Sequence, residues 1–430
     1  MTDVICAVAI NKVYPDGMKT IGFCLELSEE TSDGEAEQYT FEVWDRSYEP
    51  AMGAIQRTVK KISCPERKKI LLEMDTTEKA AYAIGNYKMD GTFDPFGPGN
   101  LGFEDPKRTG MKQEIGKKEA QKGPGKDFGY TGPKPFFVEI HVKKEEKTEQ
   151  IVSCHTWTCA ELERFEVREQ NGQKYLLYIP QDYDAGKKYP LILFIVDAAG
   201  RGTYEKEPLV QGTGALVWTE PKEQEKHPCF VMAPVYGPED ILTHDDFTFD
   251  TKLYKVKEVI DALQMEYSID PKRIYTTGQS MGCMGSCQLM IQYPSYFSGA
   301  MLVAGQWEPQ KSGAALKDNR AWILVSENDK KAYPGMNAVV EELTKQGGVA
   351  EKYFLDAKLP QEELEKEAEK EAEGGANIKY TVFDGSSVVP EGTPDGPGAN
   401  HTCTWRIAYN IEAVRDWLFE GAGGGRDESI

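Results

Sequence analysis

The chain has 430 residues, which is longer than one typical domain, so we expect at least two domains and one sizeable hydrophobic core. Its 70 acidic and 50 basic residues give a net charge of -20. That charge repels nucleic-acid phosphates and anionic lipid surfaces, so neither is an expected partner. No stretch approaches the roughly 18 consecutive apolar residues of a membrane helix, and the N-terminus has no basic region before an apolar core, so no signal peptide is expected.

Nine cysteines are scattered along the chain, an odd number that does not fit a small disulfide scaffold. We expect mostly free thiols in a reducing, cytoplasmic compartment, with secretion as the alternative if a signal peptide has been removed. Cys154, His155 and Cys159 lie close in sequence, but no second Cys/His pair stands at ligand spacing nearby. We therefore expect neither a metal nor a cofactor.

Residues 1–153 predict an immunoglobulin-like β-sandwich. Apolar and polar residues alternate there in short runs separated by turn residues, as at 20–27, 39–44 and 137–142. Between Asp90 and Lys134 the chain is rich in Gly, Pro and Lys and has no periodicity. We interpret this segment as a long sandwich loop that reaches toward the second domain and shapes access to its cleft.

Residues 160–420 predict an α/β domain. Continuous apolar runs, typical of strands covered on both faces, alternate there with segments of helical spacing, which indicates a mostly parallel sheet flanked by helices. The runs are 191–196, 230–233, 274–277, 301–304 and 322–325. A last helix is expected from Ile407 to Leu418. The charged segment 360–374 predicts a solvated helix. Residues 421–430 predict a flexible tail.

A five-residue turn, Gly278-Gln279-Ser280-Met281-Gly282, follows one of these short strands and precedes small residues that can begin a helix. A serine on such a tight strand-to-helix turn has strained backbone angles, and flanking glycines remove the Cβ atoms that would collide with the neighbouring strand and helix. The amide that follows the serine can donate to a developing oxyanion, helped by the helix dipole. The pattern predicts Ser280 as a catalytic nucleophile.

A serine nucleophile needs a histidine to take its proton and a carboxylate to orient that histidine. In folds with this turn the chain order is serine, acid, histidine, and His401 is the only histidine after Ser280. It stands in a Gly-rich segment, which we expect to be a loop. For the acid we favour Asp329, after the strand 322–325 and before Tyr333-Pro334; Glu327 is its nearest competitor, and Asp384 and Asp395 are lesser ones.

The oxyanion hole is predicted to combine the amide of Met281 with one from the small-residue segment after the strand 191–196, where we choose Ala198 over Asp197. Gln279, Gln306 and Trp307 are candidate substrate contacts, since the last two follow a strand at its carboxyl end, where ligands collect in such sheets. Simple packing is an equal alternative at that position.

These residues resemble the α/β-hydrolase esterases related to polyhydroxybutyrate depolymerases and feruloyl esterases, particularly forms with an immunoglobulin-like domain before the catalytic one. The resemblance rests on 189–194, on 270–275 leading to the nucleophile turn, on 326–329, and on His401 with Trp405. It implies a triad of Ser280, Asp329 and His401. The family usually carries His-Gly where this chain has Val196-Asp197, and we expect the Asp197 carboxylate to point away from the oxyanion or to meet Arg201.

Three functions follow from this sequence. The favoured hypothesis is a serine carboxylesterase that hydrolyses short-chain, aryl or polyester-type esters through an acyl-enzyme, with a small-molecule or polymeric ester as its partner. The first alternative is a serine peptidase of the prolyl-oligopeptidase type, since the same triad cleaves amides. The second is a non-catalytic binding protein with a degenerate hydrolase domain.

Overall fold

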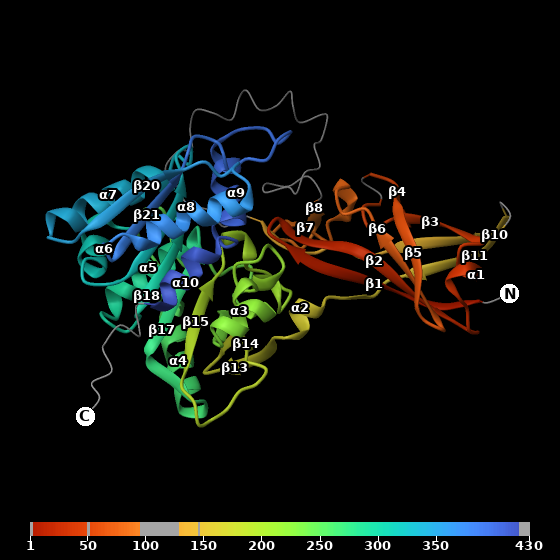
Figure 1. Ribbon diagram of the computed structural model, residues 1–430, viewed down its shortest axis with the longest axis horizontal. Coiled ribbons are helices and arrows are strands. Elements are labelled where there is room, and N and C mark those ends of the chain that lie inside the picture. Colours follow the sequence, from red (N-terminus) through yellow and green to blue (C-terminus); the bar gives the residue numbers. More distant parts are fainter. Residues whose placement is uncertain (1–2, 50–51, 95–128, 145–146, 421–430) are drawn as a thin grey trace.

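The computed structural model describes residues 3–49, 52–94, 129–144 and 147–420. In Figure 1 an all-β region at the N-terminus lies beside a larger region in which helices cover a central sheet. The predicted long loop falls mostly on 95–128, and the predicted tail on 421–430; both segments lie outside the described residues.

The N-terminal region is a sandwich of two sheets with a third, small sheet at one end. Their strand orders are β12-β1-β2-β6-β5, β11-β10-β3-β4 and β8-β7-β9. Alternate residues of the facing strands share one apolar core that includes Phe23, Leu25, Val43 and Ile140, as the period-two pattern predicts. The strands are β1 Val4–Tyr14, β2 Gly17–Leu27, β3 Tyr39–Asp45, β4 Ile55–Arg57, β5 Val59–Glu66, β6 Lys69–Met74, β7 Ile84–Tyr87, β8 Phe93–Asp94, β9 Tyr130–Pro133, β10 Val138–Lys144, β11 Lys147–Cys154 and β12 Trp157–Thr158.

Short helices and a late strand complete this region. The helical turns are α1 Asp33–Ala36 and η1 Lys79–Ala81, and α2 Ala160–Glu163 leads into the second region. Strand β12 pairs in parallel with β1, Ala9 opposite Trp157. The first sheet therefore extends beyond residue 153, where the sequence predicts the sandwich to end.

The second region contains a nine-stranded sheet in the order β13-β14-β16-β15-β17-β18-β19-β21-β20. Strands β13 and β14 pair antiparallel at one edge, and the pairs from β16 to β20 are parallel. The predicted mostly parallel sheet is thus confirmed. Its strands are β13 Glu166–Gln170, β14 Gln173–Tyr178, β15 Tyr189–Ile195, β16 Phe230–Pro234, β17 Ile269–Gln279, β18 Gly299–Val303, β19 Ala321–Ser326, β20 Ala350–Leu355 and β21 Ile378–Phe383.

Apolar layers cover both faces of this sheet, which is why its strands read as continuous apolar runs. Along β15, Leu191 and Leu193 belong to one core and Ile192 and Phe194 to the other. The layer on the Leu191 side contains α4 Lys255–Glu266, α5 Met281–Gln292, α6 Pro309–Leu316 and α7 Ala332–Lys345. The opposite layer contains η4 Val217–Thr219, α8 Gln361–Glu373, α9 Pro397–Ala408 and α10 Glu412–Glu420. The remaining short helices are η2 Ala198–Gly200, η3 Glu207–Leu209, α3 Pro221–Lys226 and η5 Thr251–Tyr254.

Two of the predicted helices in the second half of the chain differ in the structure. The expected single helix from Ile407 to Leu418 is two helices, because the Asn410 side chain donates to the Arg406 carbonyl and closes α9. The Glu365 carboxylate of α8 then accepts from the first amides of α10, a favourable place for negative charge. Helix α8 is also not simply solvated, since its Leu364 and Ala368 are buried.

No helix among the described residues is long and apolar enough to cross a membrane.

Candidate active site

The predicted nucleophile lies on a sharp turn between β17 and α5. Ser280 has φ 52° and ψ -116°, a strained positive-φ conformation for a residue other than glycine. Its amide donates to the Val303 carbonyl of β18 at 3.0 Å, which fixes the turn to the next strand. This geometry raises the serine hydroxyl at the carboxyl end of the sheet, as the sequence predicts.

Close packing explains the glycines of this turn. A methyl group at Gly282 would lie 1.9 Å from the Ile195 carbonyl oxygen, and one at Gly278 would lie 2.4 Å from the Gly282 carbonyl carbon. Helix α5 and strand β15 can therefore approach each other only because both positions lack a Cβ atom.

We expect the substitution Gly282→Ala to destabilise the chain by more than about 3 kcal/mol, because a backbone carbonyl cannot yield as a side chain can. Thermal unfolding followed by circular dichroism measures the effect. Gly398→Ala is the matched control, since a methyl group on that glycine of α9 would meet no other packed segment of the described residues within 4 Å. An unchanged melting temperature for Gly282→Ala contradicts the packing argument.

Ser280, His401 and Asp329 come together from three separate segments. The Ser280 Oγ lies 2.8 Å from His401 Nε2, and His401 Nδ1 lies 2.5 Å from Asp329 Oδ2. With a proton on Nδ1, the ring donates to Asp329 and its Nε2 accepts from the serine hydroxyl. The arrangement is that of a general base poised beside a nucleophile.

The structure also distinguishes the acidic candidates. Asp329 is 3% exposed and accepts from the amides of Lys331 and Ala332 through its other oxygen. Burial opposes its ionisation, but the hydrogen bond and charge of His401 and these amides outweigh it, so its pKa lies below the usual value. Among the other candidates, Glu327 accepts from the Gly385 amide, and Asp395 accepts from Asn400 and Ser386.

His401 stands in a helix rather than in the expected loop. Pro397 occupies the first turn of α9, where its missing amide hydrogen and fixed φ favour a helix start. The adjacent Asn400 is buried and donates to Asp395, while the Ser326 hydroxyl at the end of β19 donates to it. The His401 ring also meets the edge of Trp405, with centroids 5.3 Å apart. These contacts hold the imidazole in place.

The oxyanion loop, residues 197–202, follows β15 beside the nucleophile turn. The Asp197 carboxylate accepts from the amides of Ala199 and Gly200 at 2.6 and 3.2 Å. The Ala198 amide has no hydrogen-bond partner among the described residues, and the same holds for the Met281 amide at the start of α5. Both amides are thus available to an incoming oxyanion.

Asp197 has a partner that the sequence did not suggest. Its Oδ2 accepts from Gln279 Nε2 at 2.8 Å. Burial raises the pKa of the Asp197 carboxyl, and the hydrogen bonds from Gln279 and Ala199 oppose that rise. Because all three bonds hold its carboxylate within the loop, Asp197 organises the loop backbone.

Two of the three candidate substrate contacts are buried. Gln279 is 2% exposed and is bonded to Asp197. Trp307 is 1% exposed, and its indole N–H donates to Gln288. Gln279 Nε2 and the Trp307 indole N–H thus each have a protein partner, and a substrate contact for either residue stays a prediction. Gln306 is partly exposed and donates to Asp245 at 3.1 Å.

The loop that contains Thr243, Asp245 and Phe247 lies beside α5 and the acid. Thr243 donates to the Met281 carbonyl, and Asp245 accepts from Gln306 and pairs with Lys331, two residues after Asp329. Phe247 in the same loop is 39% exposed and meets Trp307 edge to face. The sequence suggests that residues 244–246 line the cleft, but an exposed aromatic next to polar positions gives no periodic signal, so Phe247 was not singled out.

A separate hollow of about 380 Å³ is lined by Gly202 at the end of the oxyanion loop and by Val235 and Lys252 among others. Its Lys252 pairs with Asp240, and its Lys174 pairs with Glu205. None of the triad residues lines it.

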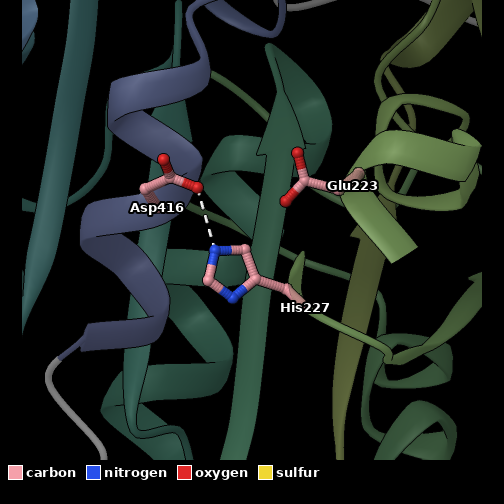
Figure 2. A group of neighbouring side chains, drawn as sticks. All are labelled: Glu223, His227 and Asp416. Atoms are coloured by element: carbon pink, nitrogen blue, oxygen red, sulfur yellow. Dashed lines mark hydrogen bonds and ion pairs between the residues drawn. The ribbon is translucent and has the colours of Figure 1, made fainter. Parts of the chain in front are cut away.

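Glu223, His227 and Asp416 form a group whose ligand-type atoms lie within 4.8 Å of one another (Figure 2). His227 Nε2 lies 2.9 Å from Asp416 Oδ1. Arg415 pairs with Glu223, and Lys226 pairs with Asp416, each at 2.8 Å. Two cations thus already balance the two carboxylates, and the group is best described as an ion-pair network that joins α3 to α10.

All nine cysteines are free thiols.

Comparisons with known proteins agree with this architecture. No protein-family model matches the chain. A local match of 50 residues, 38% identical, links it to poly(3-hydroxyalkanoate) depolymerase C of Paucimonas lemoignei, and it covers 12% of each protein. The chain thus matches only about an eighth of the length of that curated relative.

Among solved structures, the chain is similar to one described as a thermostable esterase, with a TM-score of 0.69 and 21% identity over 97% of this chain and 99% of the other. A feruloyl esterase module from Clostridium thermocellum is also similar, with a TM-score of 0.39 and 14% identity over 62% of this chain and 90% of the other. The first likeness establishes the fold, an α/β hydrolase preceded by an all-β region. The resemblance indicated by the motifs is confirmed at that level.

Proposed function

We propose that this protein is a carboxylic-ester hydrolase that works through an acyl-enzyme on Ser280. The observation that carries the proposal is the unbroken chain of hydrogen bonds from Ser280 through His401 to Asp329. Folding alone does not require a buried carboxylate, an imidazole and a strained serine to lie together at one edge of the sheet. They are the groups that acyl transfer requires.

The reaction follows from the geometry. Ser280 Oγ attacks the ester carbonyl carbon while its proton passes to His401 Nε2, and the Asp329 carboxylate stabilises the imidazolium that forms. The carbonyl oxygen becomes negative, and the amides of Met281 and Ala198 donate to it. Collapse of this intermediate expels the alcohol, which takes the proton from His401. Water, deprotonated by the same histidine, then releases the acid and regenerates the serine.

Ester substrates are preferred in this proposal over peptides. The curated relative with the local match is named for a polyester, and the thermostable esterase is similar over nearly the whole of both chains. Within the ester class we propose short-chain, aryl or polyester-type substrates, because the curated relative with the local match is named for a polyester and the oxyanion loop carries the small residues Ala198, Ala199 and Gly200.

A matched substrate panel tests the proposal. Purified full-length protein is assayed with 4-nitrophenyl esters of increasing acyl length, methyl ferulate, a hydroxybutyrate oligomer, and the 4-nitroanilides of the same acids. We expect kcat/KM for an ester to exceed that for its anilide by at least about 10³-fold, since the two share one acyl group but the amide carbonyl is less electrophilic and the anilide is the poorer leaving group. A preference for an anilide over its matched ester indicates a peptidase instead, and turnover of none of these compounds indicates a non-catalytic protein.

A further inference from the structure

The oxyanion loop is contacted directly by the N-terminal region. Strand β9 lies against η2, and its Thr131 places Oγ1 3.1 Å from the Ala199 carbonyl oxygen and 2.8 Å from Glu207 Oε1. Gln211 Nε2 approaches the same hydroxyl. In Figure 1, β7, the partner of β9, lies where the sandwich meets the α/β region. A single threonine thus contacts three groups of the other region.

The numbers of hydrogen-bond donors and acceptors on these three groups and on Thr131 decide which group donates to which. The Ala199 carbonyl can only accept, and the Gln211 amide nitrogen can only donate. Thr131 has one hydroxyl hydrogen and two lone pairs, so the protonation of Glu207 decides how the hydroxyl is used. If Glu207 is neutral, its O–H and the Gln211 N–H donate to Thr131, whose own hydrogen is then free for Ala199. If Glu207 is ionised, two acceptors compete for one hydrogen.

The surroundings favour the neutral form. Glu207 is 0% exposed, and its Oε2 has no hydrogen-bond partner among the described residues. Burial raises the pKa of this carboxyl well above its usual value; the hydrogen bond with Thr131 opposes that rise only in part, and the nearby Asp197 charge adds to it. The Thr131 hydrogen is therefore directed to the Ala199 carbonyl.

Strand β9 is itself firmly held to the rest of the N-terminal region. Its neighbour Lys134 is 3% exposed and forms an ion pair of 2.5 Å with the buried Asp45 of β3. The Lys134 amide also donates to the Ala83 carbonyl. Thr131 thus projects from a strand that is fixed in place. If the oxyanion loop moved, Thr131 would not move with it, and the hydrogen bond between Thr131 and the loop would break.

We propose that Thr131, oriented by Glu207, is a positioning residue for the oxyanion loop, so that the N-terminal region forms part of the catalytic apparatus. The loop is then fastened on two sides: Asp197 binds the amides of Ala199 and Gly200, and Thr131 binds the Ala199 carbonyl. The Ala198 amide, one residue before, is held where an oxyanion forms. This inference rests on the proposed esterase function.

Variants of Thr131 in the full-length chain test the inference. Thr131→Val keeps the shape but removes the hydroxyl, and we expect kcat for the best ester to fall about 10- to 100-fold, the usual effect of removing a group that orients a catalytic one, with KM within about threefold. Thr131→Ser keeps the hydroxyl and is expected to retain kcat within about threefold. Thr40→Val, at an exposed position of β3, is the matched control and is expected to match the wild type.

Glu207 supplies the second set of variants. Glu207→Gln is expected to preserve kcat within about threefold, because its amide N–H donates to Thr131 as the neutral carboxyl does. A loss beyond tenfold in Glu207→Gln overturns the role given to the neutral carboxyl. If Thr131→Val does not fold, Thr131→Ala replaces it, with an expected loss of at least about fivefold because only water can then reach the Ala199 carbonyl.

The outcomes separate the inference from the proposed function. A wild-type protein that hydrolyses no ester contradicts the proposed function. If the wild type is active and folded Thr131→Val or Thr131→Ala keeps its kcat, the proposed function stands and the positioning role is refuted. An equal loss in Thr131→Ser and Thr131→Val also refutes it, since the hydroxyl then carries no effect.

Discussion

Ser280→Ala is expected to lower kcat for ester hydrolysis by a factor on the order of 10⁴ to 10⁶, the largest effect of any single substitution in this chain. The change removes one oxygen and leaves His401 bonded to Asp329, so the fold and the oxyanion amides persist. Only the covalent route is lost. Residual turnover then comes from attack by water on an ester whose carbonyl oxygen the oxyanion amides still stabilise.

Steady-state kinetics on the best ester of the panel measures this effect, and thermal unfolding verifies that the variant is folded. The control is Ser153→Ala, at an exposed position of β11 that is remote in sequence from the triad; it is expected to match the wild type. If folded Ser280→Ala retains more than about 1% of kcat, far above the residual rate expected without the nucleophile, another group is the nucleophile.

Asp329→Asn is expected to lower kcat by about 10⁴-fold while leaving the fold unchanged. The asparagine oxygen can keep the bonds from the amides of Lys331 and Ala332, each 3.0 Å long. Its NH₂ group then faces His401 Nδ1 and donates to it. The imidazole proton is forced onto Nε2, where it prevents the ring from accepting the proton of Ser280.

Glu327→Gln is the matched control for this change. Glu327 is the nearest competitor in the sequence, and its carboxylate accepts from the Gly385 amide at 2.8 Å, a bond that a glutamine oxygen can replace. We expect kcat within about threefold of the wild type, since the change leaves the His401 partner untouched. A large loss in Glu327→Gln together with normal activity in Asp329→Asn reverses the assignment of the acid.

The sequence leads to Ser280, Asp329 and His401, which the structure brings together, because it offers few alternatives. One histidine follows Ser280, and the nucleophile turn has a strict local requirement for small flanking residues, visible in Gly278 and Gly282. The strands of the central sheet could also be predicted from the sequence, because burial on both faces produces continuous apolar runs such as 191–196. Local pattern and tertiary structure agree at these positions.

Contacts between distant segments could not be predicted from the sequence. The partner of Asp197 is Gln279, 82 positions away, and Thr131 meets Ala199 from another sheet, 68 positions away. Neither pair has a periodic or local signature. The helix that carries His401 was missed because Gly396 and Gly398 suggested a loop, while Pro397 between them begins the helix.

Fluorophosphonate labelling tests the central claim, that Ser280 is an activated nucleophile, most directly. The full-length protein is treated with a fluorophosphonate, and the site of the adduct is located by peptide mass spectrometry. We predict one adduct per chain, on Ser280, formed by the wild type and absent from Ser280→Ala. An unlabelled wild-type protein, or an adduct on any other residue, contradicts the proposed mechanism.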